Sequence, residues 1–86
     1  MGKKVIVVGD STSHGGAVMQ GCSMARIDGK PIARKGDLVS CPIHGSNPIV
    51  EGSASYALNG VPVALHGHRS ACGSLLIGSV LPSVDA

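Results

Sequence analysis

The apolar residues of this chain come in short runs that glycines and small polar residues interrupt. VIVV at residues 5–8 and SLLIGSV at residues 74–80 are two such runs. No window places apolar residues at i, i+3, i+4 and i+7 over the length of a helix, as an amphipathic helix requires. Asp28-Gly29 and Asn59-Gly60 lie between apolar runs and are typical of tight hairpin turns. The pattern predicts an all-β fold of short strands and hairpins.

Two segments of the chain repeat each other. Residues 28–41 (DGKPIARKGDLVSC) match residues 59–72 (NGVPVALHGHRSAC) at an offset of 59 − 28 = 31 residues. At that offset Gly, Pro, Ala, Gly and Cys are identical, and an aspartate corresponds to an asparagine. Each segment has an apolar strand, a Gly-Asp or Gly-His pair, three residues and then Cys.

The N-terminal segment KKVIVVGDSTSH is a degenerate third copy. Its Gly9-Asp10 pair matches Gly36-Asp37, and His14 occupies the position that Cys41 and Cys72 have in the other copies. Each copy is followed by a second short apolar run. We therefore expect a rough threefold repetition of hairpins about a common axis.

The composition indicates a single small domain over residues 1–86 that needs support beyond its core. The chain has no Phe or Trp, one Tyr and 13 glycines, so burial per residue is low and the entropy cost of folding is high. Chains of this size usually depend on a disulfide, a metal ion or a partner. Three cysteines is an odd number and no signal peptide is visible, so metal ligation is the more common use of such cysteines.

The coordinating side chains gather at equivalent places in the repeats. If the copies pack about one axis, His14, Cys41 and Cys72 converge near it. His44 follows Cys41 by three residues and His68 precedes Cys72 by four, so each pair can reach one ion from one turn. Zinc prefers a tetrahedron of Cys sulfur and His nitrogen, and a bound zinc ion can supply the missing stability.

Two further candidates are interpreted as non-ligands. His66 corresponds to Lys35 in the repeat, which is a solvated position. Cys22 follows a glycine and corresponds to Ser53, so we interpret it as a small buried residue.

Charge and composition argue against other function classes. A net charge of +2, the near absence of aromatic residues and the lack of a recognition helix give no support for nucleic-acid binding. No stretch approaches the roughly 20 apolar residues of a spanning helix, so stable membrane insertion is not expected. The alternatives to a structural role are a small zinc enzyme and a nucleic-acid-binding zinc module. An enzyme would need an open metal position for water, which a closed four-ligand site lacks.

The segments GDSTSHGG, DGKPIARKGDLVSCPIHG and NGVPVALHGHRSACG together resemble the PAAR-repeat family over roughly residues 5 to 80. The resemblance implies a small cone of β-hairpins with pseudo-threefold symmetry and a zinc ion near its apex, typically held by three histidines and one cysteine. It also implies a function: a cone that caps and sharpens the trimeric VgrG spike of a type VI secretion system, aids envelope penetration and often carries an effector.

Transferred to this chain, the resemblance implies a structural zinc held by His14, His44, His68 and Cys72, and no enzymatic activity. His68 stands where the other two copies have aspartate, so it is a departure that supplies a nitrogen. The position in the repeat favours Cys41 instead of His68 as the remaining ligand, and this alternative stays open.

The resemblance also implies the partners. We expect one chain to bind one VgrG-like trimer, with any effector a separate protein, because the chain ends at LPSVDA soon after the last motif. The expected localisation is cytoplasmic before assembly, followed by delivery into a target cell with the spike.

Overall fold

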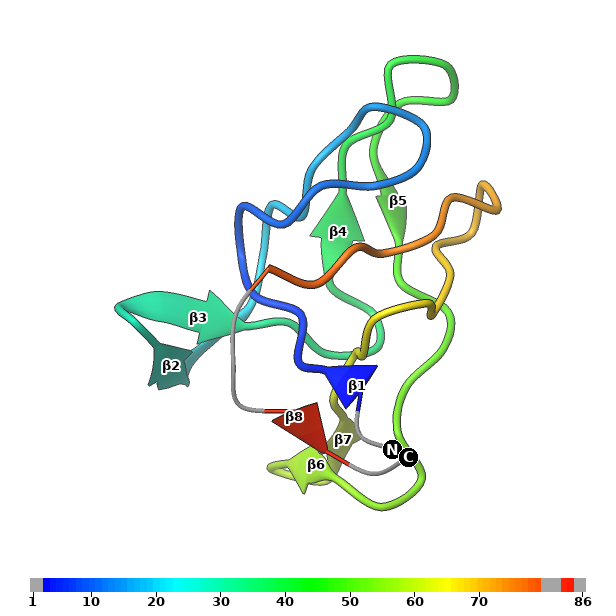
Figure 1. Ribbon diagram of the computed structural model, residues 1–86. Helices are drawn as coiled ribbons and strands as arrows, with labels where there is room; N and C mark the ends of the chain where they lie inside the picture. Colours follow the sequence, from blue (N-terminus) through cyan, green and yellow to red (C-terminus); the bar gives the residue numbers. More distant parts are fainter. Residues whose placement is uncertain (1–2, 80–82, 85–86) are drawn as a thin grey trace.

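The computed structural model describes residues 3–79 and 83–84 and shows an all-β cone (Figure 1). Within these residues the chain has no helix, and hence none that is long and apolar enough to cross a membrane. The molecule is wide at one end and narrow at the other, with extents of 30 × 25 × 22 Å. The predicted all-β class is confirmed. The strands are β1 (Lys3–Lys4), β2 (Cys22–Ile27), β3 (Lys30–Ile32), β4 (Leu38–Val39), β5 (Asn47–Pro48), β6 (Ala57–Leu58), β7 (Val61–Pro62) and β8 (Ser83–Val84).

Each described strand belongs to a two-stranded antiparallel pair: β1 with β8, β2 with β3, β4 with β5, and β6 with β7. The two predicted tight turns close β2–β3 and β6–β7. Asp28 and Gly29 have φ of 52° and 79°, and Asn59 and Gly60 have φ of 53° and 78°. Positive φ at both central residues is the geometry of a type I′ turn, which Asp-Gly and Asn-Gly favour. The loop between β4 and β5 is longer and spans residues 40–46.

A closed ring of backbone hydrogen bonds lies at the centre of the cone. The Ile6 amide donates to the Ala64 carbonyl at 3.0 Å, the Ala64 amide to the Ala33 carbonyl at 3.0 Å, and the Ala33 amide to the Ile6 carbonyl at 2.8 Å. All three side chains are fully buried. Ala33 and Ala64 are equivalent in the sequence repeat, and Ile6 takes their place in the N-terminal copy. The ring therefore gives the chain its pseudo-threefold arrangement.

A second cyclic set of contacts lies between the ring and the narrow end. One residue of each repeat forms an isolated antiparallel β-bridge with a residue in one of the short apolar runs that follow the repeats. These bridges are Thr12–Leu76, Val18–Val39 and Ile49–Ser70.

The core consists of two small clusters of aliphatic side chains stacked along the pseudo-threefold axis. One cluster holds the residues of the ring and the apolar residues of the second set of contacts. The other holds residues next to the ring and is covered partly by Tyr56. Their members are Ile6, Val18, Ala33, Val39, Ile49, Ala64 and Leu76 in the first, and Val5, Val7, Ile32, Val63 and Leu65 in the second. As the composition predicted, no large aromatic side chain fills the centre.

Two Gly-Asp turns direct the chain from the core towards the narrow end. The Asp10 carboxylate accepts a hydrogen bond from the Val7 amide at 2.9 Å, and the Asp37 carboxylate accepts one from the Arg34 amide at 2.8 Å. Each aspartate thereby satisfies a backbone donor at the start of its own turn. These two turns place the following loops, and the side chains they carry, side by side.

Candidate metal centre

Three loops at the narrow end carry the side chains that the repeat placed in equivalent positions. In the first and third repeats the loops have the same form, with the Gly15 amide donating to the Thr12 carbonyl and the Gly73 amide donating to the Ser70 carbonyl. His14 and Cys72 occupy the same position in these two turns. Cys41 lies near the start of the longer loop of the middle repeat.

His14, Cys41 and Cys72 converge on one point. Their nearest ligand atoms all lie within 4.8 Å of one another. The His14 Nδ1 is 3.6 Å from the Cys41 Sγ and 3.7 Å from the Cys72 Sγ. The convergence that the repeat predicted is therefore found, and the group can hold a metal ion near one end of the cone.

The spacing of these three donors fits a tetrahedral metal with zinc-like bond lengths. Bonds of about 2.3 Å to sulfur and about 2.1 Å to nitrogen, at a tetrahedral angle, put those two atoms about 3.6 Å apart. The two observed nitrogen–sulfur separations, 3.6 and 3.7 Å, match that edge. The donor set of two thiols and one imidazole is also the chemistry that zinc accepts.

The surroundings of Cys72 favour its metal-binding form. The hydroxyl oxygens of Ser70 and Ser74 lie 3.3 and 3.5 Å from its Sγ. Hydrogen bonds with Ser70 first, and then with Ser74, lower the pKa of Cys72 from 9.0 to about 5, against the opposing effect of partial burial. His14 adds a smaller contribution in the same direction. Cys72 is consequently a thiolate at neutral pH, which is the form that binds metals.

Direct hydrogen bonds tie the three loops to one another. The Cys72 amide donates to the Asn47 side chain at 3.1 Å and so joins the third loop to the end of the middle one. The Ser13 amide donates to the Leu75 carbonyl at 2.9 Å, which joins the first loop to the third. The Ala17 amide donates to the Ser40 hydroxyl at 3.0 Å, which joins the first to the middle one. The donor atoms are therefore held near their final places by the protein itself, which lowers the ordering cost of binding.

Of the predicted ligands, His14 and Cys72 lie in this group and His44 lies beside it. The His44 ring centroid is 5.9 Å from that of His14, with the rings tilted by 45°. Its side chain is exposed on the loop between β4 and β5. His44 is thus a neighbour of the three-residue group and stays a predicted fourth ligand.

His68 is not brought to the group, and Cys41 takes the place that was predicted for it. The His68 Nδ1 accepts a hydrogen bond from the Leu65 amide at 2.9 Å. Asp10 and Asp37 do the same for the amides three residues before them. The imidazole therefore substitutes for the turn aspartate of the other repeats. The structure favours the alternative that the repeat position indicated.

The other two coordinating residues lie outside the group. His66 is exposed, and its Nδ1 accepts a hydrogen bond from the Gly78 amide at 2.9 Å. Cys22 is buried in β2, as expected for a small packing residue. Sequence reasoning did not single out Ser70 and Ser74, although the pattern Ser-x-Cys-x-Ser around Cys72 was a visible signal for hydroxyl partners of that sulfur.

Comparison with protein families gives one match of direct relevance. A family model described as the PAAR motif matches residues 8–78, which includes all three loops of the metal centre. Comparison with curated proteins gave no match.

Proposed function

Because the chain belongs to the PAAR-motif family, we propose that it is the metal-stapled tip of a type VI secretion spike and caps a trimeric VgrG-like protein. The observation that carries this proposal is the convergence of His14, Cys41 and Cys72, one from each repeat, at the narrow end of a cone. A tip needs its loops clamped at the apex and a broad face at the base, and the three converging loops and the hairpins at the wide end support this role.

The metal in the proposed function is a structural zinc. His14, Cys41 and Cys72 would hold it, with His44 as the fourth ligand. When bound, zinc supplies crosslinks among three loops that are distant in the sequence. Binding energies of about 10–16 kcal/mol, as found for structural zinc in small peptides, are large beside the stability of an aliphatic core of this size. The proposed role is therefore structural and not enzymatic.

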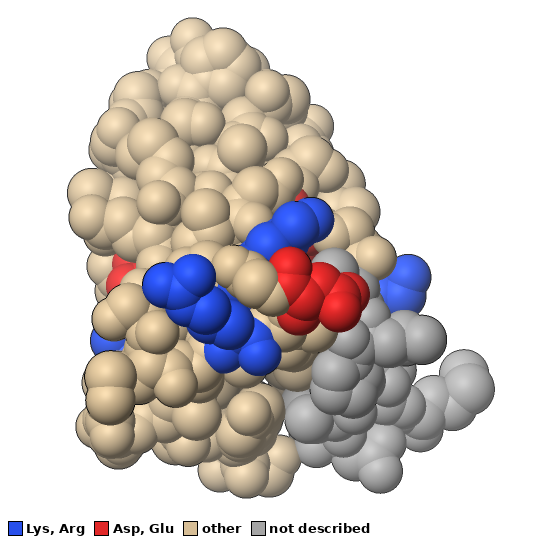
Figure 2. Space-filling view, turned by 90° about the vertical axis from the view of Figure 1, so that its left-hand side faces the viewer, with Lys and Arg blue, Asp and Glu red and all other residues tan. Residues whose placement is uncertain are grey.

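The narrow part of the cone carries no charged side chains in the segments that build it. Residues 11–21, 38–50 and 70–79 contain no Lys, Arg, Asp or Glu. On the face in Figure 2, the charged side chains lie over the middle and the wide part of the cone and leave the narrow end clear. Moving a charge out of water is costly, so an uncharged tip lowers the cost of entering an apolar layer. This supports a role in envelope penetration.

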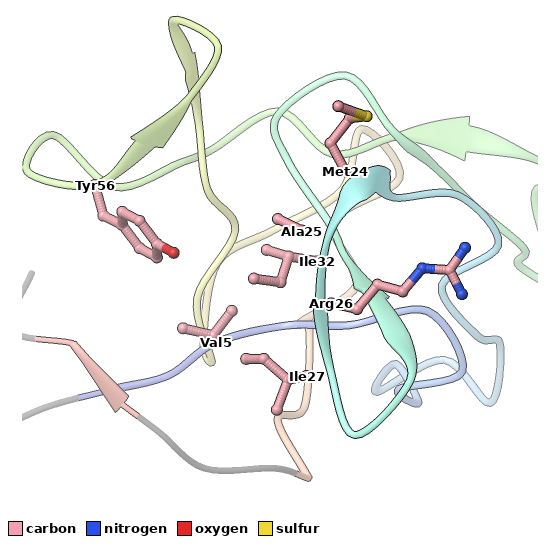
Figure 3. Close-up of a pocket in the computed structure, with 7 residues that line it drawn as sticks. All are labelled: Val5, Met24, Ala25, Arg26, Ile27, Ile32 and Tyr56. Carbon is pink, nitrogen blue, oxygen red and sulfur yellow. The ribbon is translucent and has the colours of Figure 1, made fainter.

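The wide end offers the docking face for the spike. The hairpins β2–β3 and β6–β7 and the pair β1–β8 lie at this end (Figure 1). Between the two hairpins is an open depression of about 640 Å³, lined mainly by apolar side chains (Figure 3). Met24 on its rim is 86% exposed. The pseudo-threefold arrangement suits a threefold partner, because one chain can then make similar contacts with each subunit.

The docking proposal is tested by co-purification of the full chain with the trimeric VgrG-like protein of the same secretion system. We expect a complex of one chain per trimer. Met24→Glu places a charge at the rim of the depression and should weaken the complex strongly, whereas Met19→Glu is a matched control, because Met19 is exposed but does not line the depression. A chain that stays monomeric beside its partner, or two variants that behave alike, would contradict this docking face.

The metal is tested by elemental analysis and X-ray absorption on protein purified with a reductant. We expect one zinc per chain, with two sulfur ligands and the remainder nitrogen. His14→Ala should remove the zinc and lower the melting temperature sharply. A single sulfur ligand would exclude the pairing of Cys41 with Cys72, and unchanged stability of His14→Ala would refute the staple.

The remaining parts of the proposal concern delivery. Effectors would be separate proteins that travel with the spike, and the chain would reside in the cytoplasm until assembly. Detection of the chain in culture supernatant only when the secretion system is intact is the expected result.

A further inference from the structure

The metal centre contains two thiols, and their arrangement suggests chemistry beyond metal binding. The Sγ atoms of Cys41 and Cys72 belong to a group of atoms that all lie within 4.8 Å of one another. Both are free thiols in this structure. We propose that Cys41 and Cys72 form a disulfide when the site holds no metal, so that the centre is a redox-sensitive site as well as a metal site. This inference rests on the three-residue group and not on the docking of the spike.

The geometry allows the two sulfurs to meet. The sulfur atoms of a disulfide are about 2.0 Å apart. The two Sγ atoms lie within 4.8 Å of each other, so they must approach by at most a little under 3 Å. Both cysteines lie in loops and not in strands, and a glycine with positive φ follows each of them, Gly45 in one loop and Gly73 in the other. Closing the gap requires side-chain rotation and adjustment of the loops, and it breaks no strand pairing of either cysteine.

The two cysteines differ in a way that orders the reaction. Cys72 is partly exposed, and the hydroxyls of Ser70 and Ser74 lie within 3.5 Å of its sulfur. Cys41 is only 4% exposed. An oxidant from solution therefore reaches Cys72 first, and Cys41 is the sulfur within reach to complete the bond.

The oxidant that we assign is a small-molecule disulfide such as oxidised glutathione. The Cys72 thiolate attacks one sulfur of that disulfide, and one glutathione thiolate leaves. The Cys41 thiolate then attacks the Cys72 sulfur, and the second glutathione leaves. In total, two protein thiols are oxidised to one disulfide, and one glutathione disulfide is reduced to two glutathione thiols. The two protons that the protein thiols release are taken up by the two glutathione thiolates.

Metal and disulfide exclude each other at this site. A bound zinc occupies the thiolate electron pairs and holds the sulfurs apart at tetrahedral distances, so it protects both cysteines. Oxidation removes two of the three clustered donors. His14 and the proposed fourth ligand His44 then remain, and two imidazoles without the thiolates do not retain the ion. The centre would therefore lose its metal on moving from a reducing to an oxidising compartment, and a covalent crosslink between the same two loops would take its place.

The test uses the full chain, both zinc-loaded and stripped of metal by a chelator under reductant. After removal of the reductant and addition of oxidised glutathione, alkylation and intact mass report the free thiols, and a peptide map reports which cysteines are linked. In the metal-free chain we expect two of the three thiols to be lost, with Cys41 joined to Cys72 and Cys22 still free. In the zinc-loaded chain we expect slower loss, accompanied by release of zinc to a colorimetric chelator.

Two variants control the assay. Cys41→Ser should stop at one glutathione bound to Cys72, because the second sulfur is absent. Cys22→Ser should behave as the parent chain does, since Cys22 lies in β2 and outside the group. If Cys41→Ser fails to fold by circular dichroism, the peptide map of the parent chain decides on its own.

Three results would overturn the inference: all three thiols surviving, a stable glutathione adduct on Cys72 of the parent chain, or a link that involves Cys22. Zinc stoichiometry under reductant is measured separately. A chain that binds zinc but forms no disulfide refutes this inference alone, and a chain that forms the disulfide but binds no zinc refutes the staple alone.

Discussion

The histidine in the third turn provides the sharpest test of how the narrow end is built. The His68 Nδ1 accepts the Leu65 amide at 2.9 Å, in the place where Asp10 and Asp37 accept equivalent amides. Replacing it by His68→Asp restores the residue that the other two repeats use. We expect this variant to fold, to keep its zinc and to be more stable than the parent chain.

The size of the gain follows from the charge on the acceptor. A hydrogen bond between neutral groups contributes about 0.5–1.5 kcal/mol to stability, and one to a charged group about 1.5–3 kcal/mol. Changing the acceptor from a neutral imidazole to a carboxylate should therefore add the difference between these two contributions. Because the acceptor is only partly buried, we take a value at the lower end of that difference, about 1 kcal/mol. For a domain of this size, about 1 kcal/mol corresponds to a rise in melting temperature of roughly 4–8 °C. His68→Ala removes the acceptor and should lower the melting temperature by a similar amount.

The assay is thermal unfolding followed by circular dichroism, on zinc-loaded and metal-free samples, with zinc content measured for each variant. The ordering Asp above His above Ala, with equal zinc content in all three, is the expected result. Loss of zinc in His68→Asp and His68→Ala alike would show that His68 is a ligand after all. Equal stability of the Asp and Ala variants would show that the turn hydrogen bond contributes nothing.

Three further predictions follow from the loops and the core. Gly16→Ala should weaken zinc binding and stability together, because the added Cβ would lie 1.8 Å from the Ser40 carbonyl oxygen and force the loops of His14 and Cys41 apart. Gly29→Ala is the control: this position has positive φ but open space around it, so the variant should cost only the backbone strain of about 1–2 kcal/mol. Chelator competition should show an unchanged zinc affinity for Gly29→Ala. Leu76→Ala should cost about 2–5 kcal/mol in chemical denaturation, because the side chain is fully buried in the core. In the metal-free chain, alkylation of Cys72 should have a midpoint near the pKa of about 5, and Ser70→Ala should raise it. Because folding lowers that pKa from 9.0, the contribution of the thiolate to stability is complete above about pH 9 and is lost as the pH falls towards 5. Denaturation at a series of pH values checks this dependence. An alkylation midpoint near 8 to 9 would contradict the role of the serines.

The sequence was sufficient for the features that depend on local chemistry and on repetition. Asp28-Gly29 and Asn59-Gly60 form the predicted turns because few residue pairs accept positive φ twice in succession. Equivalent positions in repeats about an axis lie at similar distances from it, and for His14, Cys41 and Cys72 that distance is short enough for the three side chains to meet.

The roles of His44 and His68 could not be settled from the sequence. A histidine nitrogen can accept from a backbone amide as well as bind a metal, and only the fold shows that His68 faces the Leu65 amide. For His44, the three-residue spacing from Cys41 left the direction of its side chain undetermined, because the middle loop is longer than its two counterparts. In each case the outcome depends on where the neighbouring backbone lies, which no residue of the motif itself encodes.

The ring that joins Ile6, Ala33 and Ala64 has a consequence for folding during synthesis on the ribosome. In an open stack of repeats, early units can settle while later ones are still being made. Here the Ile6 amide of the first arm has its acceptor, the Ala64 carbonyl, on the third arm, so the ring cannot close until Ala64 has left the exit tunnel. The complete fold therefore forms only late in synthesis. A nascent chain halted after two arms would expose its aliphatic strands to chaperones and proteases.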